Sequence, residues 1–174
     1  MNPSTADVAD LAGHRAAVTR LLDCFGLRLE NVAADARIPG SYWGDSEAGL
    51  IGDTLYARLD TPVHSVLHEA CHWICMSPRR RSNVHTDAGG TDLEECGVCY
   101  LQIVLGDALP GLGRLRILAD MDAWGYSFRL GSAGAWFETD SADAVRWLEQ
   151  ERLLVEGRPT FRLRTSPDPE PAHA

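Results

Sequence analysis

Residues 68–72, His-Glu-Ala-Cys-His, have the spacing of a metal-binding helix. On an α-helix, positions i and i+4 lie one turn apart on the same face, so the imidazoles of His68 and His72 can reach one metal ion. Glu69 lies about 100° around the helix from His68, where its carboxylate would contact a metal-bound water rather than the metal. The pattern therefore predicts a divalent metal site with Glu69 as its general base.

A catalytic zinc ion usually takes three protein ligands and leaves a fourth position for water. The third ligand is expected from the next helix, 91–105, whose first turn carries Glu94 and Glu95. Glu94 continues at helical spacing into apolar residues, which is typical of a face that turns inward. We therefore predict Glu94 as the third ligand and keep Glu95 as the alternative. A capping box with Thr91 would also account for a glutamate at position 94.

Other polar side chains near the motif are weaker candidates for metal ligands. His64 stands one turn before His68, but about 12 Å of helix axis separates His64 from His72, so one ion cannot bind all three. We expect His64 to line the cleft or to support a ligand. His85 and Asp87, in the loop after this helix, rank below the glutamates. The candidates for stabilising an oxyanion are Tyr126, Tyr100 and His85.

Four of the five cysteines offer a rival metal site. Cys71-x3-Cys75 and Cys96-x2-Cys99 could be read as four zinc thiolates. Both pairs lie in apolar helical stretches rather than on turns, so we expect free thiols that pack as small apolar groups. The apolar setting favours the histidine site instead, because two histidines and a carboxylate buried together need a compensating partner such as a cation.

The bulk properties limit the function classes. A chain of 174 residues that is 45% hydrophobic is long enough for one domain with a substantial core. A net charge of -9 argues against a nucleic-acid partner, since phosphate binding needs a clustered positive surface. The dense basic run Arg79–Arg81 is expected to be a solvated loop, where it could hold an acidic group of a substrate. No signal peptide and no apolar run of about 18 residues is present, so we expect a cytoplasmic protein without a membrane partner.

The rest of the chain must supply the elements that hold the site. Hydrophobic periodicity predicts helices at 5–24, 62–77, 91–105, 114–123 and 141–154, and strands at 27–32, 53–59 and 160–164. Thr61 is expected to cap the histidine helix. Residues 39–52, with Tyr42 and Trp43, and residues 78–90 are expected to be loops, and 124–137 a loop or small hairpin. The prediction is one α+β domain, 1–165, followed by a disordered tail, 166–174.

An H-E-x-x-H motif followed by a glutamate on the next helix resembles the zincin metallopeptidases of the glutamate-ligand type, the gluzincins, including their minimal single-domain forms. The resemblance implies a zincin-like α+β fold in which the histidine helix packs on a small sheet. Residues 53–105 match the family's order of strand, histidine helix and second helix. The resemblance further implies zinc on His68, His72 and Glu94, Glu69 as general base, and a protein or peptide substrate.

Other segments resemble bacterial elongation factor P hydroxylases. Asp23-Cys24-Phe25, Arg28-Leu29, the histidine motif through Trp73, and Asp92-Leu93-Glu94 echo that family in the same order, over residues 17–105. The resemblance implies a non-haem iron site that hydroxylates a modified lysine on a translation factor. Two histidines and one carboxylate suit ferrous iron as well as zinc.

Three functions therefore stand as predictions from the sequence. A zinc hydrolase of the metallopeptidase type ranks first because it is the commonest use of the motif. A non-haem iron hydroxylase follows from the second resemblance. A non-catalytic zincin-like domain that keeps the metal for structure is the third, and the presence of Glu69 favours catalysis over it.

Overall fold

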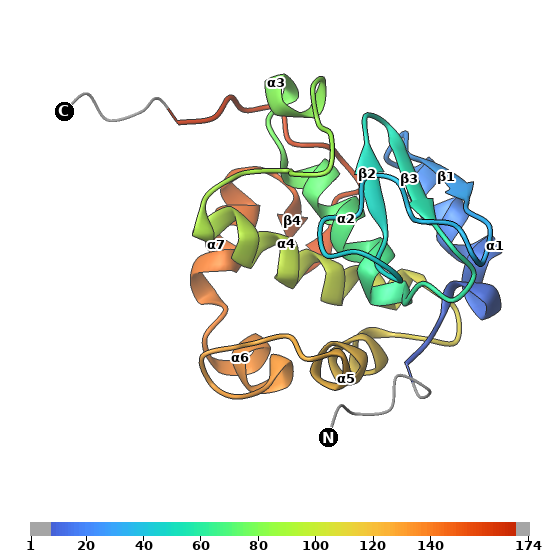
Figure 1. Cartoon of the computed structure of the whole chain (residues 1–174). Helices are drawn as coiled ribbons and strands as arrows, with labels where there is room; N and C mark the ends of the chain where they lie inside the picture. The colour runs from blue at the N-terminus through green and yellow to red at the C-terminus, as the bar shows by residue number, and fades with distance from the viewer. Residues whose placement is uncertain (1–7, 170–174) are drawn as a thin grey trace.

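Two helices, α2 (Val63–Cys75) and α4 (Asp92–Leu105), pack against each other at the centre of the computed structural model, which describes residues 8–169 (Figure 1). Across these residues the chain forms seven α-helices and two small sheets, so the predicted α+β class is confirmed. Both central helices bury most of their side chains. Each must therefore be covered by other elements on several sides.

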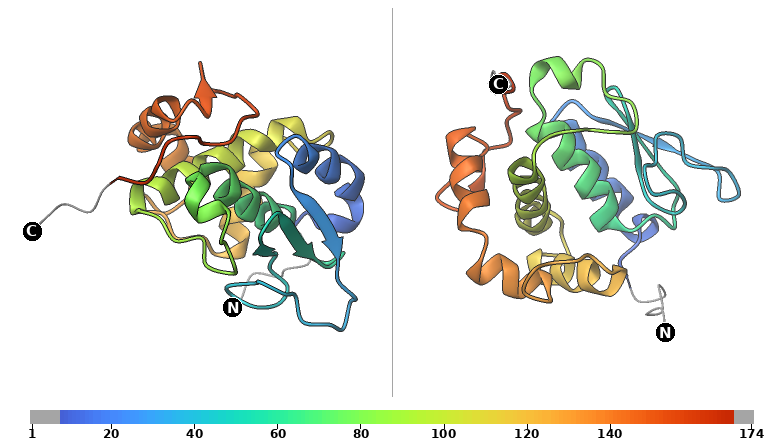
Figure 2. Two further views of the ribbon diagram at one scale, coloured as in Figure 1. Left: turned by 90° about the horizontal axis from the view of Figure 1, so that it is seen from above. Right: turned by 60° about the vertical axis from the view of Figure 1, so that its left-hand side comes forward.

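The covering elements form layers around this pair. In Figure 2, α7 (Ala142–Gln150) lies against one side of α4, while α1 (Leu11–Asp23) and the larger sheet lie on the far side of α2. Trp147 of α7 comes so close that a Cβ at Gly97 of α4 would lie 2.6 Å from its ring. The lower edge in Figure 1 is closed by α5 (Arg114–Trp124) and α6 (Ala133–Thr139).

The larger sheet has the strand order β1 (Arg28–Asn31), β3 (Thr54–Ala57), β2 (Gly49–Ile51). β1 runs parallel to β3 and β2 runs antiparallel to it, so that Leu29 and Leu50 both pair with Leu55. Leu50 and Leu55 are fully buried and belong to the same hydrophobic core as α2. The sheet therefore fixes the start of the histidine helix, which follows β3 after a short connection.

A close crossing of the chain at Gly49 shapes the loop that precedes β2. A Cβ at this position would lie 1.9 Å from the carbonyl oxygen of Pro39, so a larger residue does not fit there. Ser41 forms an isolated bridge with Gly49 across the same crossing. Between these points the loop presents Tyr42 and Trp43, which are 58% and 78% exposed. Two large aromatic side chains thus stand on the surface.

Several predicted boundaries differ from the observed ones. α1 begins at Leu11 rather than at residue 5, because Asp10 caps it by accepting a hydrogen bond from Gly13 N, and residues 5–7 lie outside the described residues. Thr61 does not cap α2; Pro62 is the N-cap residue, and Thr61 Oγ1 accepts a hydrogen bond from Arg58 N instead.

Short elements account for the other differences. Residues 78–90 contain a one-turn helix, α3 (Pro78–Arg81), which Ser77 caps. The predicted loop or hairpin at 124–137 is wrong from residue 133 onward, because α6 begins there. The strand predicted at 160–164 is absent from the described residues. Two-residue strands precede it instead, β4 (Leu154–Val155) and β5 (Arg158–Pro159), and the 3-10 turn η2 (Gly106–Ala108) follows α4.

The segment after β5 returns to the central helices. Arg164 N donates a hydrogen bond to Ile74 O in α2, and the Arg164 side chain is 3% exposed. Within the predicted disordered tail, Asp168 accepts hydrogen bonds from Ser77 Oγ and Arg80 Nε, while residues 170–174 lie outside the described residues. The late part of the chain therefore contributes to the packing of α2 and α4.

Candidate metal centre

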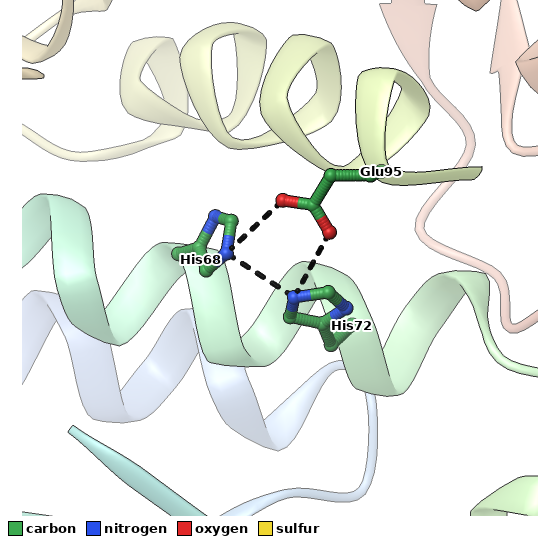
Figure 3. Close-up of side chains that lie close together, drawn as sticks. All are labelled: His68, His72 and Glu95. Atoms are coloured by element: carbon green, nitrogen blue, oxygen red, sulfur yellow. Dashed lines mark hydrogen bonds and ion pairs between the residues drawn. The ribbon is translucent and has the colours of Figure 1, made fainter. Parts of the chain in front are cut away.

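Three side chains from α2 and α4 converge on one point (Figure 3). His68 Nε2 and His72 Nε2 are 3.1 Å apart, and each lies 3.4 Å from one carboxylate oxygen of Glu95. A zinc ion held tetrahedrally at 2.0–2.1 Å separates its ligand atoms by about 3.3 Å. The distance between the two imidazole nitrogens matches that spacing, and each nitrogen lies at a similar distance from a different oxygen of Glu95. Among residues 8–169, this is the group of histidine, cysteine and acidic side chains whose ligand atoms could hold a metal.

The chemistry of this donor set fits a divalent metal. Burial lowers the pKa of His72 to about 3, with the neighbouring charge of His68 adding to the effect, so the imidazole is in its neutral, metal-binding form. His68 and His72 are mostly buried, whereas the Glu95 side chain is 49% exposed. The metal position would thus have protein on the α2 side and an opening beside Glu95, as a catalytic site requires.

Glu95, and not the predicted Glu94, lies beside the two histidines. Glu94 does turn inward as predicted, but its carboxylate pairs with Arg80 Nη2 at 2.5 Å and with Arg164 Nη1 at 3.1 Å. Adjacent residues on a helix point about 100° apart, so only one of the two glutamates can face α2 at the histidines. The apolar periodicity correctly identified the buried face of α4, which carries Glu94. The candidate ligand Glu95 lies on the half-exposed face next to it.

Glu69 lies on the same cleft as the triad. It lines two adjoining cavities of 260 and 510 Å³, each of which also contains His68 and Glu95. Burial, with smaller contributions from the charges of Glu47 and Glu95, raises the pKa of Glu69 to about 8. A cation bound by the triad would favour the carboxylate form and lower this pKa. The predicted general base therefore lines the same cleft as the candidate metal ligands.

The cavity walls contain aromatic and acidic side chains. Trp43 lines both cavities, so the loop that carries it lies over the cleft. Glu47 lines the larger one and accepts a hydrogen bond from Trp124 Nε1 at 2.7 Å, which ties the loop to the end of α5. Asp87 lines the smaller one, where its carboxylate accepts a hydrogen bond from Gly89 N.

The remaining candidate residues do not belong to the triad. His85 is exposed and its Nδ1 lies 2.9 Å from Thr86 Oγ1. Tyr100 stacks on Phe137. Tyr126 lines the larger cavity, but its hydroxyl lies 3.4 Å from His64 Nδ1 and burial raises its pKa above the ordinary value. His64 itself is fully buried behind the cleft.

The arginine run is partly buried and paired, whereas the cysteines are free thiols. The prediction of a solvated arginine loop is wrong for Arg80, which pairs with Glu94, and for Arg81, which donates hydrogen bonds to three backbone carbonyls. All five cysteines are free, as predicted, and burial raises the pKa of the Cys71 and Cys75 thiols well above the ordinary value. Within residues 8–169 the cysteines do not assemble into a metal group.

Comparison with protein families, with curated proteins and with solved structures gives no match to this chain. The two resemblances of the sequence therefore rest on the residues quoted for them. None of the helices in the described part of the chain has the length and apolar character needed to cross a membrane.

The buried histidines predict a pH dependence of stability. Burial lowers the pKa of His64 to about 3, so below about pH 6.5 the unfolded chain binds a proton that the folded chain does not. The free energy of unfolding of the metal-free protein is thus expected to fall as the pH drops from about 6.5 toward 3, by up to about 1.4 kcal/mol per pH unit for each such histidine. His72 adds the same contribution in the same direction.

His64→Phe isolates one of these two contributions. The substitution keeps an aromatic ring against Trp124 and Tyr126 and removes the titrating group. Urea unfolding with a chelator at pH 6.5 and pH 5 should show a smaller loss of stability in the variant than in the wild type. An equal loss in both proteins would contradict a buried, neutral His64.

Proposed function

We propose that this protein is a metal-dependent hydrolase of the metallopeptidase type that binds one zinc ion on His68, His72 and Glu95. The observation that carries the proposal is the position of Glu69. A buried carboxylate lies on the cavity wall that also presents the three ligand side chains, yet it is not one of the three. A site that only stored or bound a metal would not need this additional buried carboxylate.

The residues of this chain divide the reaction between them. Zinc, when bound, polarises the substrate carbonyl and lowers the pKa of a water. His68, His72 and Glu95 would hold the ion from two helices that pack against each other. Glu69 accepts the proton of the attacking water and returns it to the leaving nitrogen as the C–N bond breaks, so the carboxylate is restored at the end of each turnover.

The surroundings of the site support a protein or peptide substrate. Tyr42 and Trp43 stand at the mouth of the cleft with most of their surface exposed. Exposed aromatic side chains next to a cavity provide large, amphipathic contact surfaces for a partner chain. The cleft is also open, because Glu95 is half exposed. A polypeptide segment can therefore pass over the metal position.

A non-haem iron hydroxylase is the second candidate. Its supporting observation is that two segments of the corresponding resemblance meet in the fold, since Trp73 Nε1 donates a hydrogen bond to Phe25 O at 3.0 Å. Two histidines and one carboxylate also form the facial ligand set of non-haem iron oxygenases. In that case Glu69 would not activate water for hydrolysis, and the metal content distinguishes the two candidates.

Metal analysis is the experiment that tests the proposal. Protein expressed with both zinc and iron available, and purified anaerobically without added metal, is expected to contain one equivalent of zinc. The His68→Ala/His72→Ala double variant is expected to contain none, because both imidazole ligands are lost. Inductively coupled plasma mass spectrometry measures both.

His85→Ala serves as the matched control, because His85 is a histidine near the cleft that does not belong to the triad. It should retain the wild-type metal content. One equivalent of iron without zinc would contradict the hydrolase proposal and favour the hydroxylase. Wild-type protein that binds neither metal would overturn both candidates.

A further inference from the structure

Gln102 is a fully buried polar side chain on α4, at the back of the metal site. It follows Glu95 by seven residues, so the two side chains lie on the same face of the helix, two turns apart. The Gln102 Oε1 atom lies 2.7 Å from His68 Nδ1, the ring nitrogen opposite the one that faces Glu95. Buried amides in apolar surroundings are expected to have hydrogen-bond partners, and this partner is a candidate ligand.

The neighbours of Gln102 determine which way its amide points. Its Nε2 atom lies 3.4 Å from the carbonyl oxygen of His64. A backbone carbonyl only accepts hydrogen bonds, so the NH₂ group of Gln102 faces His64 O. The amide oxygen is then left to face His68.

This orientation fixes the proton on His68. An amide oxygen only accepts hydrogen bonds, so His68 Nδ1 must carry the proton and donate it. The lone pair of the ring then lies on Nε2, which points toward His72 Nε2 and Glu95. His72 has no such support, since its buried Nδ1 has no hydrogen-bond partner among the described residues.

We propose that Gln102 is a positioning residue that holds His68 in its metal-binding tautomer and ring orientation. The inference rests on the proposed metal site. A second hydrogen bond to a ligating histidine raises metal affinity because the ligand is already oriented when the metal arrives. Gln102 provides this bond without adding another buried carboxylate to a cleft that already contains Glu69. The backbone carbonyl of His64 holds Gln102 in turn.

Two substitutions at position 102 separate a positioning role from a packing role. Gln102→Met keeps the shape of the side chain and removes the acceptor for His68 Nδ1. It is expected to weaken zinc affinity by about 10- to 100-fold. Gln102→Glu keeps an acceptor in the same place and is expected to bind zinc more tightly than Gln102→Met. A residue that only filled space would give the opposite order, because Met packs well and Glu buries a charge.

Leu101→Met is the matched control, a methionine at the neighbouring buried position of α4, where the leucine side chain has no group that could hydrogen-bond His68. It should bind zinc as the wild type does. Zinc affinity is measured by competition with a chromophoric chelator on protein whose circular dichroism shows that it is folded. Wild-type affinity in Gln102→Met would overturn the proposal.

The ¹⁵N NMR spectrum of the metal-free wild-type protein tests the proposal without any substitution. The His68 ring is expected to carry its proton on Nδ1, and a proton on Nε2 would overturn the role of Gln102. This readout also separates the two proposals. If the wild type binds no zinc, the proposed function fails, while the tautomer of His68 still decides whether Gln102 orients the ring.

Discussion

Glu69→Gln is expected to keep zinc at one equivalent and to hydrolyse peptides about 10²- to 10⁴-fold more slowly than the wild type. Glutamine has almost the same shape as glutamate but cannot accept the proton of the attacking water, and loss of a positioned general base has effects of this size. The zinc content should not change, because Glu69 is not in the triad. The rate is measured as kcat/KM on the peptide that the wild type cleaves best in a fluorogenic peptide library.

Glu47→Gln is the matched control for this prediction. Glu47 is a second carboxylate on the wall of the same cleft, but its Oε1 atom accepts a hydrogen bond from Trp124 Nε1, and the amide oxygen of glutamine can do the same. The control should therefore lose far less activity than Glu69→Gln. Full activity in Glu69→Gln would exclude the proposed water activation.

Glu95→Gln is expected to lose zinc affinity and Glu94→Gln to lose stability, although the two residues are adjacent. Loss of a residue that hydrogen-bonds a metal ligand lowers metal affinity by up to about 100-fold. Glu95→Gln removes the charge of a ligand itself, so its zinc affinity should fall by more than that. The stability of its metal-free form should hardly change, because the Glu95 side chain is 49% exposed. Isothermal titration with zinc and urea unfolding measure the two quantities.

Glu94→Gln should instead retain the zinc site and lose stability. Breaking a buried ion pair costs about 3–5 kcal/mol, and we expect about 3 kcal/mol here because Glu151 and Asp168 still compensate Arg164. Each variant is thus the control for the other. If Glu94→Gln lost zinc while Glu95→Gln kept it, Glu94 would be the third ligand after all.

Much of the fold could be predicted from the sequence because long helices have a strong periodic signal. The helices around the histidine motif and at 91–105 are confirmed, as are strands near 27–32 and 53–59. β2 has only three residues and lies in a glycine-rich stretch, so no alternation could reveal it. α6 begins after Ser132, whose side chain accepts a hydrogen bond from Ala135 N, and its seven residues are too few to show a helical period.

The site was only partly visible in the sequence. His68, Glu69 and His72 are fixed by local helix geometry, and the structure places all three at one cleft. The third ligand depends on what lies opposite each face of α4, which periodicity does not encode, and the apolar pattern led to Glu94 instead of Glu95. Gln102 was missed for the same reason. The signal that could have revealed both is a pair of polar residues seven positions apart on an otherwise apolar helix.

The ion pair between Arg164 and Glu94 sets an order for the assembly of the metal site during synthesis. Glu94, one residue before the candidate ligand Glu95, is paired with an arginine that follows it by 70 residues. On the ribosome, α2 and α4 emerge before Arg164, so the first turn of α4 has Arg80 as its early counter-charge and receives the second only when residue 164 has also emerged. We therefore expect nascent chains that stop before Arg164 to hold Glu95 less firmly beside the histidines, and zinc capture to follow the emergence of residue 164.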